Sequence, residues 1–209
     1  MPETILIIAD SDYAVLVRQG ITDAKGSDKA IEFLTEDDLK NLGKLLADRE
    51  AKIQDLYSVV VDPINNIALA IEKGNYDSVY DWISDDHDRI PLLEAAGAKR
   101  IYFVPVTENV DSGDEEAYVN KFGLTLCKSA PNYLTGAMAA VPENKLPAEL
   151  AGKDFVAAEN AESSVFQGKD GRRCFLCVSR DDGRRRLSLV VVDGHWFADV
   201  DWMFLAEKP

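Results

Sequence analysis

The chain has 209 residues, of which 46% are hydrophobic, with 37 acidic residues, 23 basic residues and a net charge of −14. This length and apolar fraction suit a folded domain with a sizeable core and argue against a disordered chain. The excess of acid argues against nucleic-acid binding, because an acidic protein repels phosphate backbones.

Hydropathy and cysteine content indicate the compartment. No apolar run approaches the roughly 18 residues of a membrane-spanning helix, and the N-terminal MPETILIIADSD lacks the basic flank of a secretory signal. The three cysteines (Cys127, Cys174 and Cys177) are too few, and odd in number, for a disulfide framework. We expect a cytoplasmic protein without a membrane partner.

The negative charge is concentrated in the first four fifths of the chain. Residues 1–168 hold 15 basic against 30 acidic residues, a net charge of −15, whereas residues 169–209 hold 8 against 7, a net charge of +1. Such an acidic body either serves ordinary solubility or presents a surface to a basic protein partner.

The N-terminal part predicts an extension followed by a long helix. Residues 4–10, TILIIAD, are strand-like and belong to an extension over residues 1–34. The capping pattern of Thr35 and Asp38, followed by apolar residues at heptad spacing, predicts one amphipathic helix over residues 36–60. Its apolar stripe needs a cover from this chain or from a second copy, so self-association through this helix stays open.

Shorter elements are expected next. The Asp62-Pro63 pair predicts the start of a second helix that ends at Gly74, and Asn75 predicts the cap of a third. Residues 91–97 predict a short fourth helix. Residues 99–106 read as a strand, several short strands are expected between residues 118 and 141, and residues 142–171 give no clear pattern.

The last forty residues predict two hairpins. Asp182-Gly183 and Asp193-Gly194 separate three alternating runs, and Asp-Gly between such runs is typical of two-residue turns. The implied cross-strand neighbours are Cys174–Val191, Leu176–Leu189, Val178–Leu187, Val191–Trp196, Leu189–Ala198, Leu187–Val200, Ser188–Asp199 and Arg186–Asp201. We therefore expect an α+β fold, with N-terminal helices packed on an antiparallel sheet that ends in a three-strand meander.

The closing DGHWFADVDW, together with a helical first half and an alanine-bearing helix before KGNYDSVYDWISDD, carries a family resemblance. It resembles the cone-shaped, cystatin-like fold of the nuclear transport factor two-like superfamily (the SnoaL-like proteins), whose members often end in a strand, an Asp-Gly turn, a Trp and an "I-x-D" stretch. Asp193, Gly194, Trp196 and Asp199 match that ending. The resemblance implies a pocket inside the cone, in which some members catalyse reactions and many only bind.

The candidate acid–base residues are His195, Asp199 and Asp201. In the expected register, Asp199 lies four residues along the strand from His195, roughly 13 Å away at about 3.3 Å per residue. We therefore expect a turn histidine and a ladder of salt bridges, and assign no catalytic residue. His87 has three acidic neighbours (Asp85, Asp86 and Asp88) and is expected to be a solvated helix-end residue rather than a metal ligand.

The CxxC pair and the arginine clusters also receive structural interpretations. In a strand, Cys174 and Cys177 point to opposite faces, so we expect buried cysteines rather than a zinc or redox site. The basic residues at 172–173 and 184–186 are expected to be a charged strand end rather than an anion site. No cofactor or metal is predicted.

These observations favour a non-catalytic, acidic, cytoplasmic binding protein that engages a protein partner, as an inhibitor or immunity-type protein does. Two other classes stay open. One is a cone-fold protein that binds a small molecule, enzymes included, and the other is a structural or oligomerisation module that uses residues 36–60. We expect a main domain over residues 35–209 after the 1–34 extension, with a single domain as the equal alternative.

Overall fold

The computed structural model describes residues 36–85, 92, 94–141, 145–158, 166–167, 171–181, 184–192 and 195–209. The chain divides into two compact units, residues 1–55 with Pro209 and residues 56–208. The predicted extension over residues 1–34, its boundary and the strand at 4–10 lie outside the described residues. No described helix is both long enough and apolar enough to cross a membrane.

The first unit contains helix α2 (Glu36–Gln54). It begins at the predicted residue but ends at Gln54, so the expected continuation to residue 60 is wrong. Ser58–Val61 forms strand β1 instead. The cause is its run of three valines, whose branched side chains lose rotamer freedom in a helix and pack well on a sheet.

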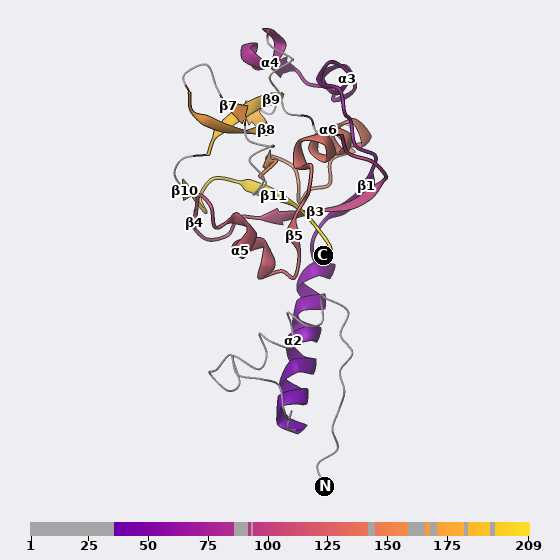
Figure 1. Ribbon diagram of the computed structural model, residues 1–209, viewed down its shortest axis with the longest axis vertical. Coiled ribbons are helices and arrows are strands. Elements are labelled where there is room, and N and C mark those ends of the chain that lie inside the picture. Colours follow the sequence, from indigo (N-terminus) through magenta and orange to yellow (C-terminus); the bar gives the residue numbers. More distant parts are fainter. Residues whose placement is uncertain are drawn as a thin grey trace. The chain divides into compact units, whose positions relative to one another are not determined.

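The second unit is built on a mixed sheet with the order β1-β3-β11-β6-β8-β9-β2, to which β5 adds beside β11 and β7 beside β8 (Figure 1). Apart from β1, its strands are β2 (Ser78–Val79), β3 (Lys99–Pro105), β5 (Thr125–Leu126), β6 (Asp154–Val156), β7 (Phe166–Gln167), β8 (Arg173–Asp181), β9 (Arg184–Val191) and β11 (Trp202–Glu207). The β6–β11 and β2–β9 pairs are parallel. The α+β class is confirmed, whereas the prediction of a purely antiparallel sheet is wrong.

Helices alternate with strands along the second unit rather than preceding them. They are α3 (Ile67–Lys73), α4 (Asp81–Asp85), α5 (Glu115–Asn120) and α6 (Ala130–Ala140). Phe103 of β3 shares the main apolar core with Tyr133 of α6, whereas Phe204 of β11 meets the ring of Tyr118 of α5 edge-on. Helices α5 and α6 therefore lie on opposite sides of β3 and β11 (Figure 1).

Helix boundaries between residues 62 and 97 differ from the expected ones. Asn66, not Asp62, caps α3, with its Oδ1 accepting the Leu69 N–H at 2.9 Å; the predicted end at Gly74 is confirmed. Asn75 has a left-handed backbone (φ 50) and precedes β2, so it caps no helix. The described residues of the predicted 91–97 helix are not helical.

Helix α6 was not expected, because its sequence was read as short strands. Every residue from Ala130 to Met138 is buried, so the helix has no polar face and shows no helical alternation of polar and apolar residues. It also fits closely against the loop between β1 and α3. A Cβ on Gly136 would lie 2.2 Å from the backbone oxygen of Asp62, so this helix position requires glycine.

The first predicted hairpin is confirmed residue by residue. Strands β8 and β9 pair in the register Cys174–Val191, Leu176–Leu189 and Val178–Leu187. The alternation of apolar residues and the Asp-Gly turn residues both indicate this register. Phe166 of β7 adds a further pair on the other side of β8, opposite Cys174.

Arg185 of β9 is fully buried, in contrast to the expected charged strand end. Its guanidinium donates hydrogen bonds to the backbone oxygens of Gly74 (2.9 Å), Met138 (3.0 Å) and Val141 (2.9 Å). These oxygens belong to the C-terminal ends of α3 and α6, whose carbonyls have no partner within the helix and carry partial negative charge. Arg185 therefore links two helix ends to the sheet.

Candidate functional site

The candidate site is the connection from β10 (His195–Trp196) to β11, together with β4 (Val110–Asp111). Strands β10 and β4 form a separate two-stranded sheet in which His195 faces Asp111 and Trp196 faces Val110. The predicted second hairpin is therefore wrong, because β10 pairs with a strand far upstream instead of with β9. We call residues 107–116 and 195–201 together the acidic ribbon.

Trp196 fixes the acidic ribbon to the second unit. Its ring is buried, stacks on Phe175 and meets Trp202 and Phe204 edge-on, with centroids 6.4, 5.6 and 5.4 Å away. Its indole Nε1 donates a hydrogen bond to Oε1 of the buried Glu115 at 2.7 Å. Because a buried carboxylate needs donors, this bond holds β10 over α5.

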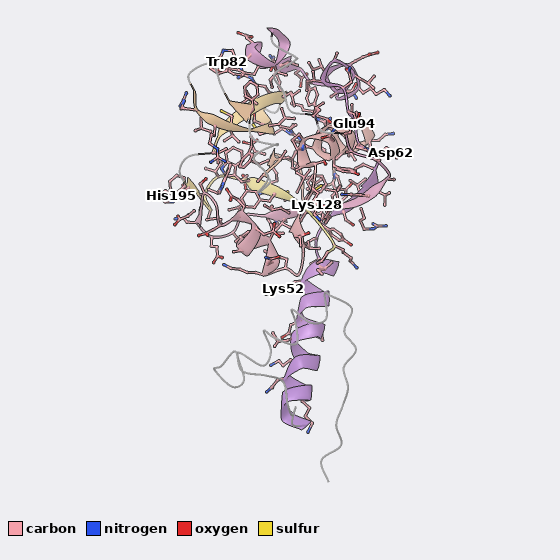
Figure 2. The ribbon with its side chains drawn as sticks, in the orientation of Figure 1. Lys52, Asp62, Trp82, Glu94, Lys128 and His195 are labelled. Atoms are coloured by element: carbon pink, nitrogen blue, oxygen red, sulfur yellow. The ribbon has the colours of Figure 1, made fainter. Side chains whose placement is uncertain are left out.

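His195 lies beside Asp111 at the periphery of the second unit (Figure 2). The imidazole Nδ1 is 2.5 Å from Oδ1 of Asp111, and the two side chains are 57% and 68% exposed. A histidine hydrogen-bonded to a carboxylate is a familiar acid–base arrangement. Here both groups face water, so the pair suits surface recognition better than catalysis in an enclosed site.

The other two candidate residues lie apart from that pair. Asp201 forms an ion pair with Lys153, and Asp199 is exposed. The predicted Ser188–Asp199 and Arg186–Asp201 pairs are wrong, because β10 pairs with β4 and the side of β9 away from β8 pairs with β2, where Arg186 faces Ser78. The sequence did not single out Asp111, because it stands 84 positions before His195 and no local pattern links the two.

Phe197 stands out on the acidic ribbon because 47% of this large apolar residue is exposed. Its ring centroid is 5.9 Å from that of His195. The backbone around it is held by two hydrogen bonds: Ala198 N–H donates to Oδ1 of Asn109 at 3.0 Å, and Val200 N–H donates to the oxygen of Phe197 at 3.2 Å. The exposed ring is thus displayed by an anchored turn.

The surroundings of Phe197 are acidic. Residues 107–116 and 195–201 contain no Lys or Arg and seven carboxylates, namely Glu108, Asp111, Asp114, Glu115, Glu116, Asp199 and Asp201. Two lysines from other segments approach, Lys121 at Glu108 and Lys153 at Asp201. Five of the seven carboxylates are exposed, whereas Glu116 is half-buried and Glu115 is buried. The exposed carboxylates outnumber the two lysines, so the acidic ribbon attracts cationic groups.

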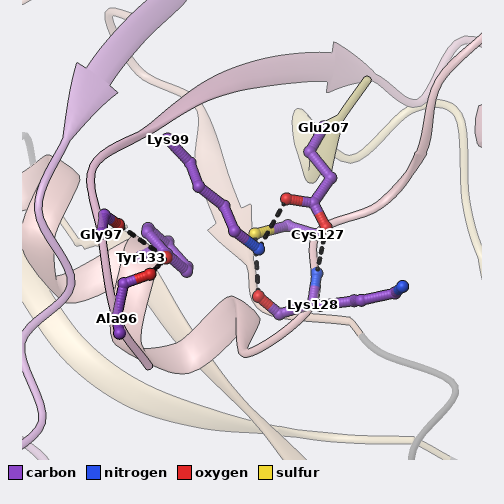
Figure 3. Close-up of polar contacts among 7 residues, drawn as sticks. All are labelled: Ala96, Gly97, Lys99, Cys127, Lys128, Tyr133 and Glu207. Carbon is purple, nitrogen blue, oxygen red and sulfur yellow. Dashed lines mark hydrogen bonds and ion pairs between the residues drawn. The ribbon is translucent and has the colours of Figure 1, made fainter. Parts of the chain in front are cut away.

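A second polar cluster lies where β3, β11 and α6 meet (Figure 3). Lys99 Nζ is 2.8 Å from Oε2 of Glu207 and 4.9 Å from the ring centroid of Tyr133. The Tyr133 hydroxyl donates to the backbone oxygen of Gly97 at 2.9 Å, and Oε1 of Glu207 accepts the Lys128 N–H at 3.1 Å. These bonds join the start of β3 to α6 and β11.

The ionisation of this cluster favours a structural role. Burial lowers the pKa of Lys99, but the hydrogen bond and charge of Glu207 outweigh it, and the net pKa is raised. Burial raises the pKa of Tyr133, and the nearby Lys99 only partly offsets that effect. Both groups therefore keep their protons at neutral pH, and neither can act as a general base there.

The CxxC cysteines are buried strand residues, as predicted. Cys174 belongs to the main apolar core, whereas Cys177, three residues along β8, lies opposite Val156 and Ser188. Burial raises the pKa of Cys177, which keeps it a thiol. Among the described residues, no group of three His, Cys, Asp or Glu side chains could hold a metal ion. The predicted role of His87 lies outside the described residues.

Comparison with known proteins gives no relative from which a function could be carried over. No family model matches this chain, and neither a curated protein nor a solved structure matches it.

Proposed function

We propose that this chain is a non-catalytic, acidic, cytoplasmic binding protein that engages a basic protein partner, in the manner of an inhibitor or immunity-type protein. The observation that carries the proposal is the composition of the acidic ribbon, with seven carboxylates and no Lys or Arg in a chain of net charge −14. An acidic face attracts basic partners, accelerates their association and disfavours acidic competitors.

The chemistry of the polar clusters supports binding over catalysis. Lys99 and Tyr133 keep their protons at neutral pH, and Cys177 is a buried thiol. His195 and Asp111 lie open to water. An enzyme would need a base or nucleophile beside an enclosed substrate, and none of these groups offers that combination.

Affinity capture from the source organism tests the proposal. The bait is the full chain, and the control bait carries Asp111→Asn, Asp199→Asn and Asp201→Asn. We expect the parent bait to retain a basic protein that the control bait does not retain and that high salt elutes. The purified partner should bind the parent chain again, with a Kd that increases with salt concentration. Equal recovery on both baits would count against the proposal.

A second candidate function, binding of a small molecule as the cone-fold resemblance implies, is favoured by one observation. A hollow of about 560 Å³ lies between α3 and α6 and is lined by Asp62, Pro63, Ile64, Asn65, Asn66, Leu69, Lys73, Gly136, Ala139 and Ala140. Its size suits a small ligand. None of these residues belongs to a strand, whereas the cone fold implies a pocket against the sheet. The hollow therefore supports binding of a small molecule but does not support the cone fold.

A thermal-shift screen of metabolites tests this second candidate. A ligand of this hollow should raise the melting temperature of the parent chain by mass action and should lose that effect in a Leu69→Arg variant. If a metabolite raised the melting temperature of the Leu69→Arg variant as much as that of the parent chain, it would bind at another site. Self-association through residues 36–60 also stays a proposal, now limited to the helical part Glu36–Gln54.

A further inference from the structure

We infer that the turn around Phe197 is the docking surface, and that its occupant is a basic protein that presents an apolar surface bordered by Lys or Arg side chains. This inference rests on the proposed function and adds the location of the contact and the chemistry of the partner. It combines three independent features of the acidic ribbon: an exposed aromatic ring, a rigid support and a surplus of carboxylates.

The exposed ring provides the apolar centre. Phe197 is 47% exposed although its neighbour Trp196 is buried among aromatic rings. Aromatic residues at the centre of an interface contribute much of its binding energy when a partner excludes water from them. The ring of His195, 5.9 Å away, extends the same surface.

The support makes the ring an effective anchor. Trp196 is fixed by its bond to Glu115, and Asn109 holds the next turn through Ala198. Because this backbone is already ordered, little conformational entropy is lost when a partner binds. A rigid aromatic anchor therefore binds more tightly than the same residue on a mobile loop.

The charges select the partner. Three carboxylates of the acidic ribbon are exposed near Phe197: Asp111 faces His195 across the β4–β10 pair, and Asp199 and Asp201 follow Phe197 in the chain. They repel a second copy of this chain and an anionic lipid surface. They favour a protein whose apolar patch has a cationic rim.

Two synthetic peptides serve as probes: one alternates lysine with leucine, and the other has serine in place of each leucine at the same length and charge. We expect the parent chain to bind the leucine peptide about tenfold more tightly than the serine peptide, as for one aromatic contact. Phe197→Ser should remove that preference and leave binding of the serine peptide unchanged. The amide NMR signals of residues 195–201 should shift with the leucine peptide.

Matched variants locate the contact. Val60→Ser removes another exposed apolar side chain, 52% exposed on β1, and should leave the preference intact. Neutralising Asp111, Asp199 and Asp201 to asparagine should weaken the binding of both peptides, whereas neutralising the exposed Glu72, Glu94 and Glu149 to glutamine should not.

Three results would overturn the inference. If the parent chain bound the two peptides with equal affinity and Phe197→Ser changed neither affinity, the apolar contact at Phe197 would be refuted and the proposed function would stand. A preference abolished by Val60→Ser instead would place the contact on β1. Absence of binding by either peptide, even at low salt, would remove the proposed function and the inference together.

Discussion

Arg185 and Asp111 are both charged residues on strands of the second unit, yet the fold uses them in opposite ways. Arg185 is fully buried and donates to three backbone oxygens. The side chain of Asp111 is 68% exposed, and its partner among the described ion pairs is His195, which is itself 57% exposed. The first charge completes the fold, whereas the second remains accessible to a partner.

The difference teaches where charge contributes to stability in this protein. A buried charge is tolerated when donors and acceptors of the backbone satisfy it, and its removal leaves those groups without partners. An exposed pair contributes little to folding because water screens it. Substitution of Arg185 should therefore change the stability of the fold, whereas substitution of the exposed carboxylates of the acidic ribbon should change binding.

The largest effect is expected at Arg185. Arg185→Met removes the donor for Gly74, Met138 and Val141, and should lower the free energy of unfolding by about 3–5 kcal/mol. Arg184→Met, at the exposed neighbouring position, is the control and should change it by about 0.5 kcal/mol or less. Urea unfolding measures both. Similar values for the two variants would contradict the role of Arg185.

The next effect concerns the fit of α6. Gly136→Ala places a Cβ against the backbone oxygen of Asp62 and should destabilise by about 1–3 kcal/mol, despite the better helix propensity of alanine. At Gly43 of α2 a Cβ meets nothing within 4 Å. Gly43→Ala should therefore be neutral or stabilising by up to about 1 kcal/mol. If Gly136→Ala proved equally harmless, the close contact would be wrong.

A smaller effect is expected beneath the acidic ribbon. Trp196→Phe keeps an aromatic ring but removes the indole N–H, so Oε1 of Glu115 loses this donor, while the Gly113 N–H still donates to Oε2. We expect a loss of about 1–3 kcal/mol, measured by thermal unfolding. In the double variant with Glu115→Leu the total loss should be smaller than the sum of the two single losses; simple additivity would argue against the bond.

The smallest stability effect should depend on pH. Burial raises the pKa of Asp154, while the Arg180 N–H and charge lower it in part. An acid whose pKa is higher in the folded protein costs stability once it ionises, so the cost is absent at low pH and present above the folded pKa. Asp154→Asn should therefore melt at a higher temperature than the parent at pH 7.

Asparagine at this position can still accept the Arg180 N–H through Oδ1, as Asp154 does at 2.7 Å. The advantage of the variant should disappear as the pH falls toward about 4, the ordinary range of aspartate. An advantage that stays constant across this range would mean that ionisation of Asp154 is not its cause.

Two Asp-Gly pairs show how much of this fold was open to prediction. The pair at 182–183 gave the register of β8 and β9 correctly, because the pairing strands are adjacent in the sequence and their apolar patterns agree. The pair at 193–194 suggested the same arrangement, but β10 pairs with β4. A partner so distant in sequence leaves no local pattern, so the His195–Asp111 contact could not be foreseen.

The sequence did not predict helix α6, for a different reason. Helix prediction relies on a polar face, and a helix buried from Ala130 to Met138 has none. The burial of Arg185 was also beyond prediction, because its acceptors are backbone oxygens of two helices that only the tertiary structure brings together. The alternation in β8 was visible in the sequence because it is a property of one short segment.

Strand β11 follows every other described strand along the chain, yet it lies between β3 and β6 within the sheet. While the ribosome is still making this protein, β3 and β6 must wait without their common neighbour until residues 202–207 emerge. Unpaired strand edges readily recruit other chains. The chain is thus most vulnerable to aggregation in the period before residues 202–207 leave the ribosome, and a chaperone present at that stage should increase the yield of folded protein.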